Sequence, residues 1–255
     1  MRKMLFCVAT LSALAGCAAN KPNAGLNQYI RDLDYQPFAL PRSQDGVGTI
    51  IDFKNGTESL VATGDECFLK MNGSTVNKRK VGTTDVERTI DLGADMSFSL
   101  PRSLLSFADI SGLAKASKAK SIKVSLKQPF EQYISRLQFR SYVNGLSSTD
   151  PCKPLLTDAQ NLIISQTLGA ESVSYQFLDS SDNAISLTAD IVNGANLKPE
   201  LRSKIQNTNK LETAEPLLIG YRTWDVTKPS GVIGTELDVR EVPRQELEAR
   251  RENSR

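Results

Sequence analysis

Apolar and polar residues alternate in the first long segment of the chain, which predicts β-structure. Over residues 47–53, Val, Thr, Ile and Phe occupy the odd positions, and Gly, Ile and Asp occupy the even ones. Asn55-Gly56 ends this run, and Asn-Gly between apolar runs is a strong hairpin signal because both residues tolerate positive φ. A second pair, Asn72-Gly73, follows. The pattern predicts an antiparallel meander over about residues 46–80, and residues 96–100 predict one more strand.

The periodicity changes in the middle of the chain. Residues 122–126 alternate as a strand, whereas the apolar residues of 129–137 recur at helical spacing, which predicts a helix that opens at Pro129. Residues 157–160, Thr-Asp-Ala-Gln, match a capping box, in which the Thr and Gln side chains satisfy each other's backbone donors. This motif predicts a second helix, which ends at Gly169.

The last third of the chain returns to alternation. Residues 173–177 and 185–191 flank a polar turn and predict a hairpin with one buried face. Pro199 predicts the start of a short helix, and residues 217–226 and 232–242 predict a final strand pair. The whole pattern predicts the α+β class: an antiparallel β-sheet of meanders and hairpins, with about three short helices packed on one face.

The N-terminus carries a different pattern. Arg2 and Lys3 precede an apolar run from Met4 to Ala15, which is far shorter than the ~20 residues that a membrane-spanning helix needs. A charged start, a short apolar core and small residues at its end are typical of a secretory signal peptide. The sequence therefore predicts that residues 1–16 are a signal peptide.

Leu14-Ala15-Gly16-Cys17 resembles the lipobox of bacterial lipoproteins at all four positions. The resemblance implies that the Cys17 thiol receives a diacylglyceryl group, that cleavage occurs before this cysteine, and that its new amine is acylated. Two or more acyl chains hold a protein firmly on a membrane. Ala18, in place of aspartate, implies sorting to the outer membrane. The alternative interpretation is an ordinary signal peptide that contains an incidental cysteine.

The remaining chain divides into three predicted parts. Residues 17–30 are the lipidated cysteine and a flexible tether, because their composition is polar and contains Pro and Gly. Residues 31–242 form the α+β domain, or alternatively a β-rich part at 46–100 and a second part at 121–242. Residues 243–255 are a charged tail, either a solvated helix or a disordered segment.

The cysteines predict one disulfide bond. Cys7 leaves with the signal peptide and Cys17 carries lipid, so Cys67 and Cys152 remain of the four cysteines. In an oxidising periplasm such a pair predicts a disulfide, and the alternative is two separate buried thiols. The chain contains no histidine, so we expect no metal site at this pair.

The charge balance argues against binding to nucleic acid. Removal of Arg2 and Lys3 lowers the number of Lys and Arg residues from 31 to 29, which equals the 29 Asp and Glu residues. Nucleic-acid binders normally carry a basic excess. One local cluster of cations has no acidic residue within it: Lys115, Lys118, Lys120, Lys123 and Lys127. It predicts an anion-binding surface for lipid head groups or glycan, or a solvated loop and strand face, which we favour.

The absence of histidine excludes Ser-His-Asp and Cys-His catalytic pairs. Three short motifs nevertheless follow the order found in serine penicillin-binding enzymes and β-lactamases: S-x-x-K from Ser117 to Lys120, S-D-N at 181–183, and a loose K-T-G at 228–231. Ser117 lies in a polar, lysine-rich stretch instead of opening a long buried helix, and residues 181–183 have the composition of a turn. We interpret these motifs as chance matches and expect no cofactor.

These observations predict a non-enzymatic lipoprotein, anchored to the outer membrane through Cys17 and facing the periplasm. It would act as a binding or assembly module of the envelope, such as a secretion accessory, with another envelope protein as its partner. The first alternative is a histidine-free hydrolase that uses Ser117 and Lys120. The second alternative is a binder of anionic lipid or glycan through the lysine cluster.

Overall fold

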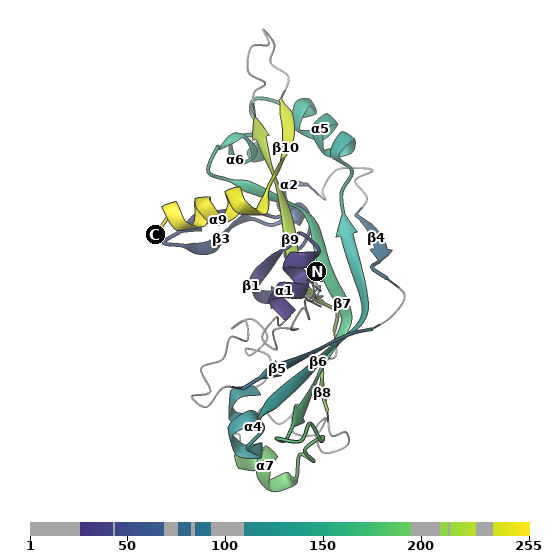
Figure 1. Cartoon of the computed structure of the whole chain (residues 1–255). Coiled ribbons are helices and arrows are strands. Elements are labelled where there is room, and N and C mark those ends of the chain that lie inside the picture. The colour runs from purple at the N-terminus through teal and green to yellow at the C-terminus, as the bar shows by residue number, and fades with distance from the viewer. Residues whose placement is uncertain are drawn as a thin grey trace, which may run out of the picture.

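The structure, a computed structural model, describes residues 26–42, 44–68, 76–82, 85–92, 110–194, 210–213, 215–227 and 237–255. Its strands form one antiparallel sheet with short helices around it, which confirms the α+β class. The molecule is elongated along its two longest strands, β6 (Ser121–Tyr133) and β7 (Leu162–Leu178), as Figure 1 shows.

The other elements have the following bounds. The strands are β1 (Gln36–Arg42), β2 (Ile50–Lys54), β3 (Thr57–Ala62), β4 (Asn77–Lys80), β5 (Val86–Asp91), β8 (Leu211–Glu212), β9 (Leu217–Thr227) and β10 (Asp238–Val242). The helices are α1 (Leu26–Asp32), α2 (Gly64–Cys67), α4 (Ile110–Ser117), α5 (Arg136–Gly145), α6 (Cys152–Thr157), α7 (Ala189–Gly194) and α9 (Arg244–Asn253).

Strand β7 is the centre of the sheet. It pairs with β6 along most of its length, and also with β2, β8 and β9, always antiparallel. Most of its 17 residues are buried, on both faces. A strand buried on both faces carries a nearly continuous apolar run and no alternation, which explains why its first half was not recognised as a strand.

Helices cover both faces of the sheet, and they are more numerous than the three predicted on a single face. On one face, Tyr221 of β9 packs on Phe38 with ring centroids 4.7 Å apart, in the same core cluster as Leu247 of α9. On the other face, Trp224 packs on Phe139 of α5 at 5.5 Å. In Figure 1, α5 and α6 lie at one end of the molecule, α4 and α7 lie at the other, and α1 lies near the middle.

The sheet changes direction near the middle of β6 and β7. Gln128 of β6 has a φ of +46°, and Pro129, which has no amide hydrogen, follows it. Across the strand pair, a Cβ atom on Gly169 would lie 2.6 Å from Cζ of Phe130 and 2.9 Å from the Leu217 carbonyl oxygen. The ring of Phe130 therefore occupies the space that a side chain at residue 169 would need.

Several predicted elements are confirmed. Asn55 and Gly56, with φ of +51° and +70°, connect β2 to β3 as a hairpin turn. Strands are also present where residues 122–126, 173–177 and 217–226 predicted them.

The two helices predicted in the middle of the chain are wrong. Residues 129–133 continue β6, and the helix begins only at Arg136 of α5. The capping-box residue Thr157 ends α6 instead of beginning a helix, and its hydroxyl donates to the Lys153 carbonyl oxygen at 2.9 Å. Residues 162–169 belong to β7 because pairing on both sides overrides local helix signals.

Two of the predicted hairpins also differ. After the turn at 179–183, Ala184 forms only an isolated bridge with Leu178, and the chain continues into α7. The meander predicted over 46–80 breaks at Cys67, which lies in α2, and β4 pairs with β6. Asn72-Gly73, residues 96–100, the helix predicted at Pro199 and residues 232–236 lie outside the described residues.

The predicted charged tail forms helix α9, which docks on the sheet. Leu247 is its buried apolar residue and is 3% exposed. At the end of the helix, Nε of Arg251 donates to the Gly56 carbonyl oxygen at 2.8 Å, and the Gly56 amide donates to Oγ of Ser254 at 3.1 Å. The C-terminal residues are therefore attached to the β2–β3 hairpin.

Candidate functional site

The lysines of strand β6 lie on the polar face of the sheet. Ile122, Val124 and Leu126 point into the core, so Lys123 and Lys127 point the other way. Each of these two lysines is paired with a carboxylate. Nζ of Lys123 lies 2.5 Å from Glu87, and Nζ of Lys127 lies 2.7 Å from Glu212.

The lysine hydrogen bonds lower the pKa of both glutamates, so the carboxylates stay ionised and balance these two cations.

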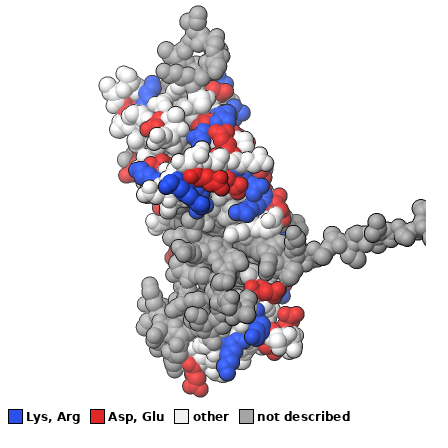
Figure 2. Space-filling model, turned by 60° about the vertical axis from the view of Figure 1, so that its left-hand side comes forward, with Lys and Arg blue, Asp and Glu red and all other residues white. Residues whose placement is uncertain are grey.

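The other lysines of the predicted cluster lie on different elements. Lys118 and Lys120 are exposed in the turn between α4 and β6, and Lys118 has a φ of +55°. Lys115 belongs to α4, and its side chain is outside the described part of the structure. On the face shown in Figure 2, the described cationic and anionic side chains are interspersed. The five lysines are thus spread over a helix, a turn and a strand.

A polar depression lies beside Lys123 on the polar face of the sheet. Its floor contains one cross-strand row, Thr89 of β5, Lys123 of β6 and Gln176 of β7, which are directly opposite one another in register. The depression has a volume of about 480 Å³ and is lined by Thr89, Asp91, Lys123, Gln176, Leu178, Asp182 and Ala184. It offers hydroxyl, amide, ammonium and carboxylate groups, which suit hydrogen bonding to a polar partner surface. We define these seven residues as the polar depression.

The residues of the hydrolase hypothesis have structural partners. Oγ of Ser117 donates to the Ala114 carbonyl oxygen of its own helix at 3.2 Å. The backbone amides of Ser181 and Asn183 donate to Oδ1 of Asp179 at 2.8 and 2.9 Å. These hydrogen bonds lower the pKa of Asp179, and the bond from Asn183 has the larger effect. This arrangement is an Asx-type turn. The predicted third motif, residues 228–231, lies outside the described residues.

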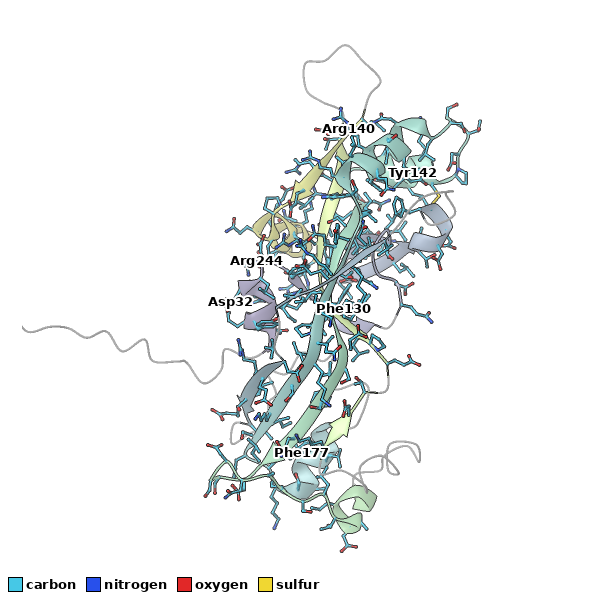
Figure 3. All side chains as sticks on the ribbon, turned by 90° about the vertical axis from the view of Figure 1, so that its right-hand side faces the viewer. Asp32, Phe130, Arg140, Tyr142, Phe177 and Arg244 are labelled. Atoms are coloured by element: carbon cyan, nitrogen blue, oxygen red, sulfur yellow. A yellow bond between two sulfur atoms is a disulfide. The ribbon has the colours of Figure 1, made fainter. Side chains whose placement is uncertain are left out.

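The two cysteines predicted to pair are brought together. Cys67 at the end of α2 and Cys152 at the start of α6 have sulfur atoms 2.08 Å apart, at disulfide distance, and both are buried (Figure 3). A capping box formed by Thr63 and Glu66 starts α2. The Tyr142 hydroxyl donates to the Cys67 carbonyl oxygen, and burial raises the pKa of Tyr142 to about 12. These contacts hold α2, α5 and α6 as one end of the molecule.

A second polar cluster, which the sequence did not reveal, fixes α1 to the middle of the sheet. The Tyr35 hydroxyl donates to Oε1 of Glu131 at 2.7 Å, and Arg79 donates to the other oxygen of this carboxylate at 2.5 Å. The Arg222 guanidinium lies over the Tyr35 ring at 4.6 Å and donates to the Leu33 carbonyl oxygen at 2.7 Å. Burial is the main cause that raises the pKa of Tyr35.

A third cluster fixes α9. Asp225 of β9 accepts from Nη2 of Arg240 at 2.6 Å and from Nη2 of Arg250 at 2.9 Å, while Glu246 pairs with both arginines. The sequence showed Glu246 and Arg250 at helical spacing but not their partner. Asp225 itself was the available signal in the sequence. It is a carboxylate in a mostly apolar strand, and a buried charge needs partners of opposite charge.

Within the described ranges, no group of three or more Cys, Asp and Glu side chains is placed to hold a metal ion. None of the described helices is long and apolar enough to cross a membrane.

No family model matches the chain, and no curated protein sequence matches it. Among solved structures, the chain is similar to a bacterial gasdermin from Bradyrhizobium tropiciagri, with 16% sequence identity and a TM-score of 0.49. This similarity covers 85% of the present chain and 89% of the gasdermin chain.

Proposed function

We propose that the protein is a lipoprotein anchored to the outer membrane through Cys17, which acts at the periplasmic face as a non-enzymatic binding or assembly module. The observation that carries this proposal is the placement of Cys67 beside Cys152. Structural disulfides persist in oxidising compartments such as the periplasm. The cysteine pair and the lipobox thus support export independently of each other.

The distance between the anchor and the fold supports a role close to the membrane. Leu26, the first residue of α1, is nine positions after Cys17. Nine residues span at most about 30 Å when fully extended. The second polar cluster, around Tyr35, fixes α1 to the sheet. A lipid on Cys17 would therefore keep the sheet within that distance of the bilayer surface.

The polar depression supports binding as the activity. Its lining combines donors and acceptors from three strands and the turn after β7. The Ser117 hydroxyl, which a histidine-free hydrolase would use as nucleophile, is instead engaged in a helix-end contact, and Ser181 lies in a turn. An open polar surface of this kind fits a partner protein of mixed charge.

Two experiments test the proposal. The first compares Cys17→Ser with Cys7→Ser as the matched control, using radioactive palmitate labelling and membrane fractionation of the producing cells. We expect Cys17→Ser to abolish labelling and release the protein from the membrane fraction, whereas Cys7→Ser changes neither. Labelling that survives in Cys17→Ser would reject the anchor.

The second experiment places a photo-crosslinking amino acid at Gln176 in the polar depression, and at exposed Gln245 on α9 as the control. We expect a discrete crosslinked envelope protein from position 176 in intact cells and none from position 245. Equal crosslinking from both positions would reject the depression as the binding surface.

A further inference from the structure

The Asn55-Gly56 turn has a chemical property that goes beyond a binding role. An asparagine followed by glycine is prone to intramolecular deamidation, because glycine leaves the next backbone nitrogen open to approach. The sequence contains four such pairs: Asn55-Gly56, Asn72-Gly73, Asn144-Gly145 and Asn193-Gly194. The structure describes the surroundings of Asn55-Gly56 and of Asn144-Gly145. Different contacts protect these two pairs from deamidation.

At Asn144, the side chain itself is held. Its Nδ2 donates to the carbonyl oxygens of Arg140 and Leu237 at 3.0 and 2.9 Å. Its Oδ1 accepts from the Leu237 amide at 2.7 Å. Three hydrogen bonds therefore keep Cγ of Asn144 away from the nitrogen that would attack it.

At Asn55, the contact is on the attacking nitrogen instead. Asn55 is exposed, while Gly56 is buried, and the Gly56 amide donates to Oγ of Ser254 at 3.1 Å. The Ser254 hydroxyl donates its own hydrogen to the Arg251 carbonyl oxygen at 3.0 Å, so a lone pair of Oγ faces Gly56. Removing the amide proton would leave a negative nitrogen facing that lone pair, which disfavours the reactive form.

We propose that Asn55 is a deamidation site whose reactivity is controlled by the docking of helix α9 through Ser254. When α9 leaves the hairpin, hydroxide removes the Gly56 amide proton and the nitrogen attacks Cγ of Asn55. A C–N bond forms, the bond from Cγ to Nδ2 breaks, and ammonia leaves with a proton taken from water. The cyclic imide then takes up one water molecule at either carbonyl, which gives aspartate or isoaspartate.

The product differs from the original hairpin in two ways. It carries a new negative charge at residue 55, and isoaspartate also adds a methylene group to the backbone of the turn. The β2–β3 connection depends on positive φ at both Asn55 and Gly56. A lengthened backbone does not fit this two-residue turn. The modification is irreversible, so the modified fraction increases with the time that α9 spends undocked.

The test follows deamidation of the full mature chain at mildly alkaline pH by peptide mapping with mass spectrometry. We expect Ser254→Ala to raise the rate at Asn55 several-fold, Ser254→Thr to restore the slow rate, and Leu247→Ala to raise it through loss of helix docking. The rate at Asn144 serves as the internal control and stays unchanged in the Ser254 variants. Equal rates at Asn55 in the wild type and in Ser254→Ala would overturn the proposal.

Hydrogen exchange of the Gly56 amide gives a second measurement that does not depend on slow chemistry. We expect this amide to be protected in the wild type and in Ser254→Thr, and to lose protection in Ser254→Ala. Fast exchange in the wild type would mean that Ser254 does not hold the nitrogen, and it would also overturn the proposal.

Discussion

Arg250 of helix α9 donates from Nη2 to Oδ2 of Asp225 on strand β9, at 2.9 Å, across 25 positions of sequence. The same carboxylate accepts from Nη2 of Arg240 at 2.6 Å, and the Asp225 side chain is only 6% exposed. A buried carboxylate between two guanidinium groups is satisfied only while both donors are in place. The stability of the sheet therefore depends on helix α9 staying docked beside Asp225.

Asp225→Asn is expected to destabilise the protein, because the neutral amide cannot hold two arginines by charge. Charge-assisted hydrogen bonds contribute about 1.5–3 kcal/mol each, and we expect the free energy of unfolding to fall by an amount in that range. Urea unfolding measures this change. Asp238→Asn is the matched control, since its carboxylate lies 3.7 and 3.9 Å from Arg136 and Arg140, whose side chains are 57% and 41% exposed. Its effect should stay below about 1 kcal/mol, and an equal loss in both variants would contradict the prediction.

Acid should weaken the attachment of α9. The hydrogen bond from Arg240 is the main cause that lowers the pKa of Glu246 from its ordinary value of 4.5 to about 2. Because the folded-state pKa lies below the unfolded one, the contribution of Glu246 to stability is complete above pH 4.5 and is lost as the pH falls towards 2.

The pH prediction is checked by urea midpoints measured through this interval. We expect Glu246→Gln to start from a lower midpoint at neutral pH and to lose less on acidification than the wild type does. Glu248→Gln, on the same helix and 3.7 Å from Arg244, is the control and should follow the wild-type slope. Parallel pH profiles for the wild type and Glu246→Gln would show that this carboxylate does not act as described.

Reduction of the cysteine pair should destabilise the protein strongly. Cys67 and Cys152 are 85 positions apart, and the entropy model for a loop of this length gives at most about 4–5 kcal/mol. We expect reductant, Cys67→Ser and Cys152→Ser to lower the denaturation midpoint by the same amount. The double variant should then be insensitive to reductant. A midpoint that does not respond to reductant would indicate that the two thiols are not joined.

Gly169 and Phe130 should be energetically coupled. A methyl group at residue 169 would overlap the Phe130 ring, so Gly169→Ala is expected to cost about 1–3 kcal/mol, as overpacking substitutions do. Phe130→Leu removes the ring edge and should recover part of that cost in the double variant. A double-mutant cycle measures the coupling, which we expect to exceed about 0.5 kcal/mol. Additive effects would show that the ring does not fill this space.

Within strand β7, the alternation of apolar and polar residues located the second half, and the fully buried first half was missed. Residues 173–177 alternate because Gln176 faces the polar depression while Phe177 faces the core, and this strand was predicted. Leu162, Ile163 and Ile164 are all fully buried, so the same strand lacks alternation at its start. A local capping-box match at residues 157–160 was then enough to suggest a helix. Residues 162–169 form a strand because they pair with strands that are distant in sequence, and no local pattern shows such pairing.

The candidate site was predictable only in part for the same reason. Elimination among four cysteines identified Cys67 and Cys152 as the pair, because that inference needs no knowledge of geometry. The lysine cluster was visible in the sequence, whereas the carboxylates beside it were not. Glu87 and Glu212 lie 36 positions before and 85 positions after the lysines that they meet, and only the sheet register brings them there.

The central position of β7 has a consequence for how the chain reaches its native state. Its partners begin at Ile50 on one side and extend to Trp224 on the other, so the sheet closes through contacts of very large sequence separation. Proteins dominated by such contacts fold slowly, because long loops must close before any pairing energy is gained. A nascent chain that has not yet produced β9 therefore has no complete sheet, and β7 stays unpaired on that side until residues 217–227 have been synthesised.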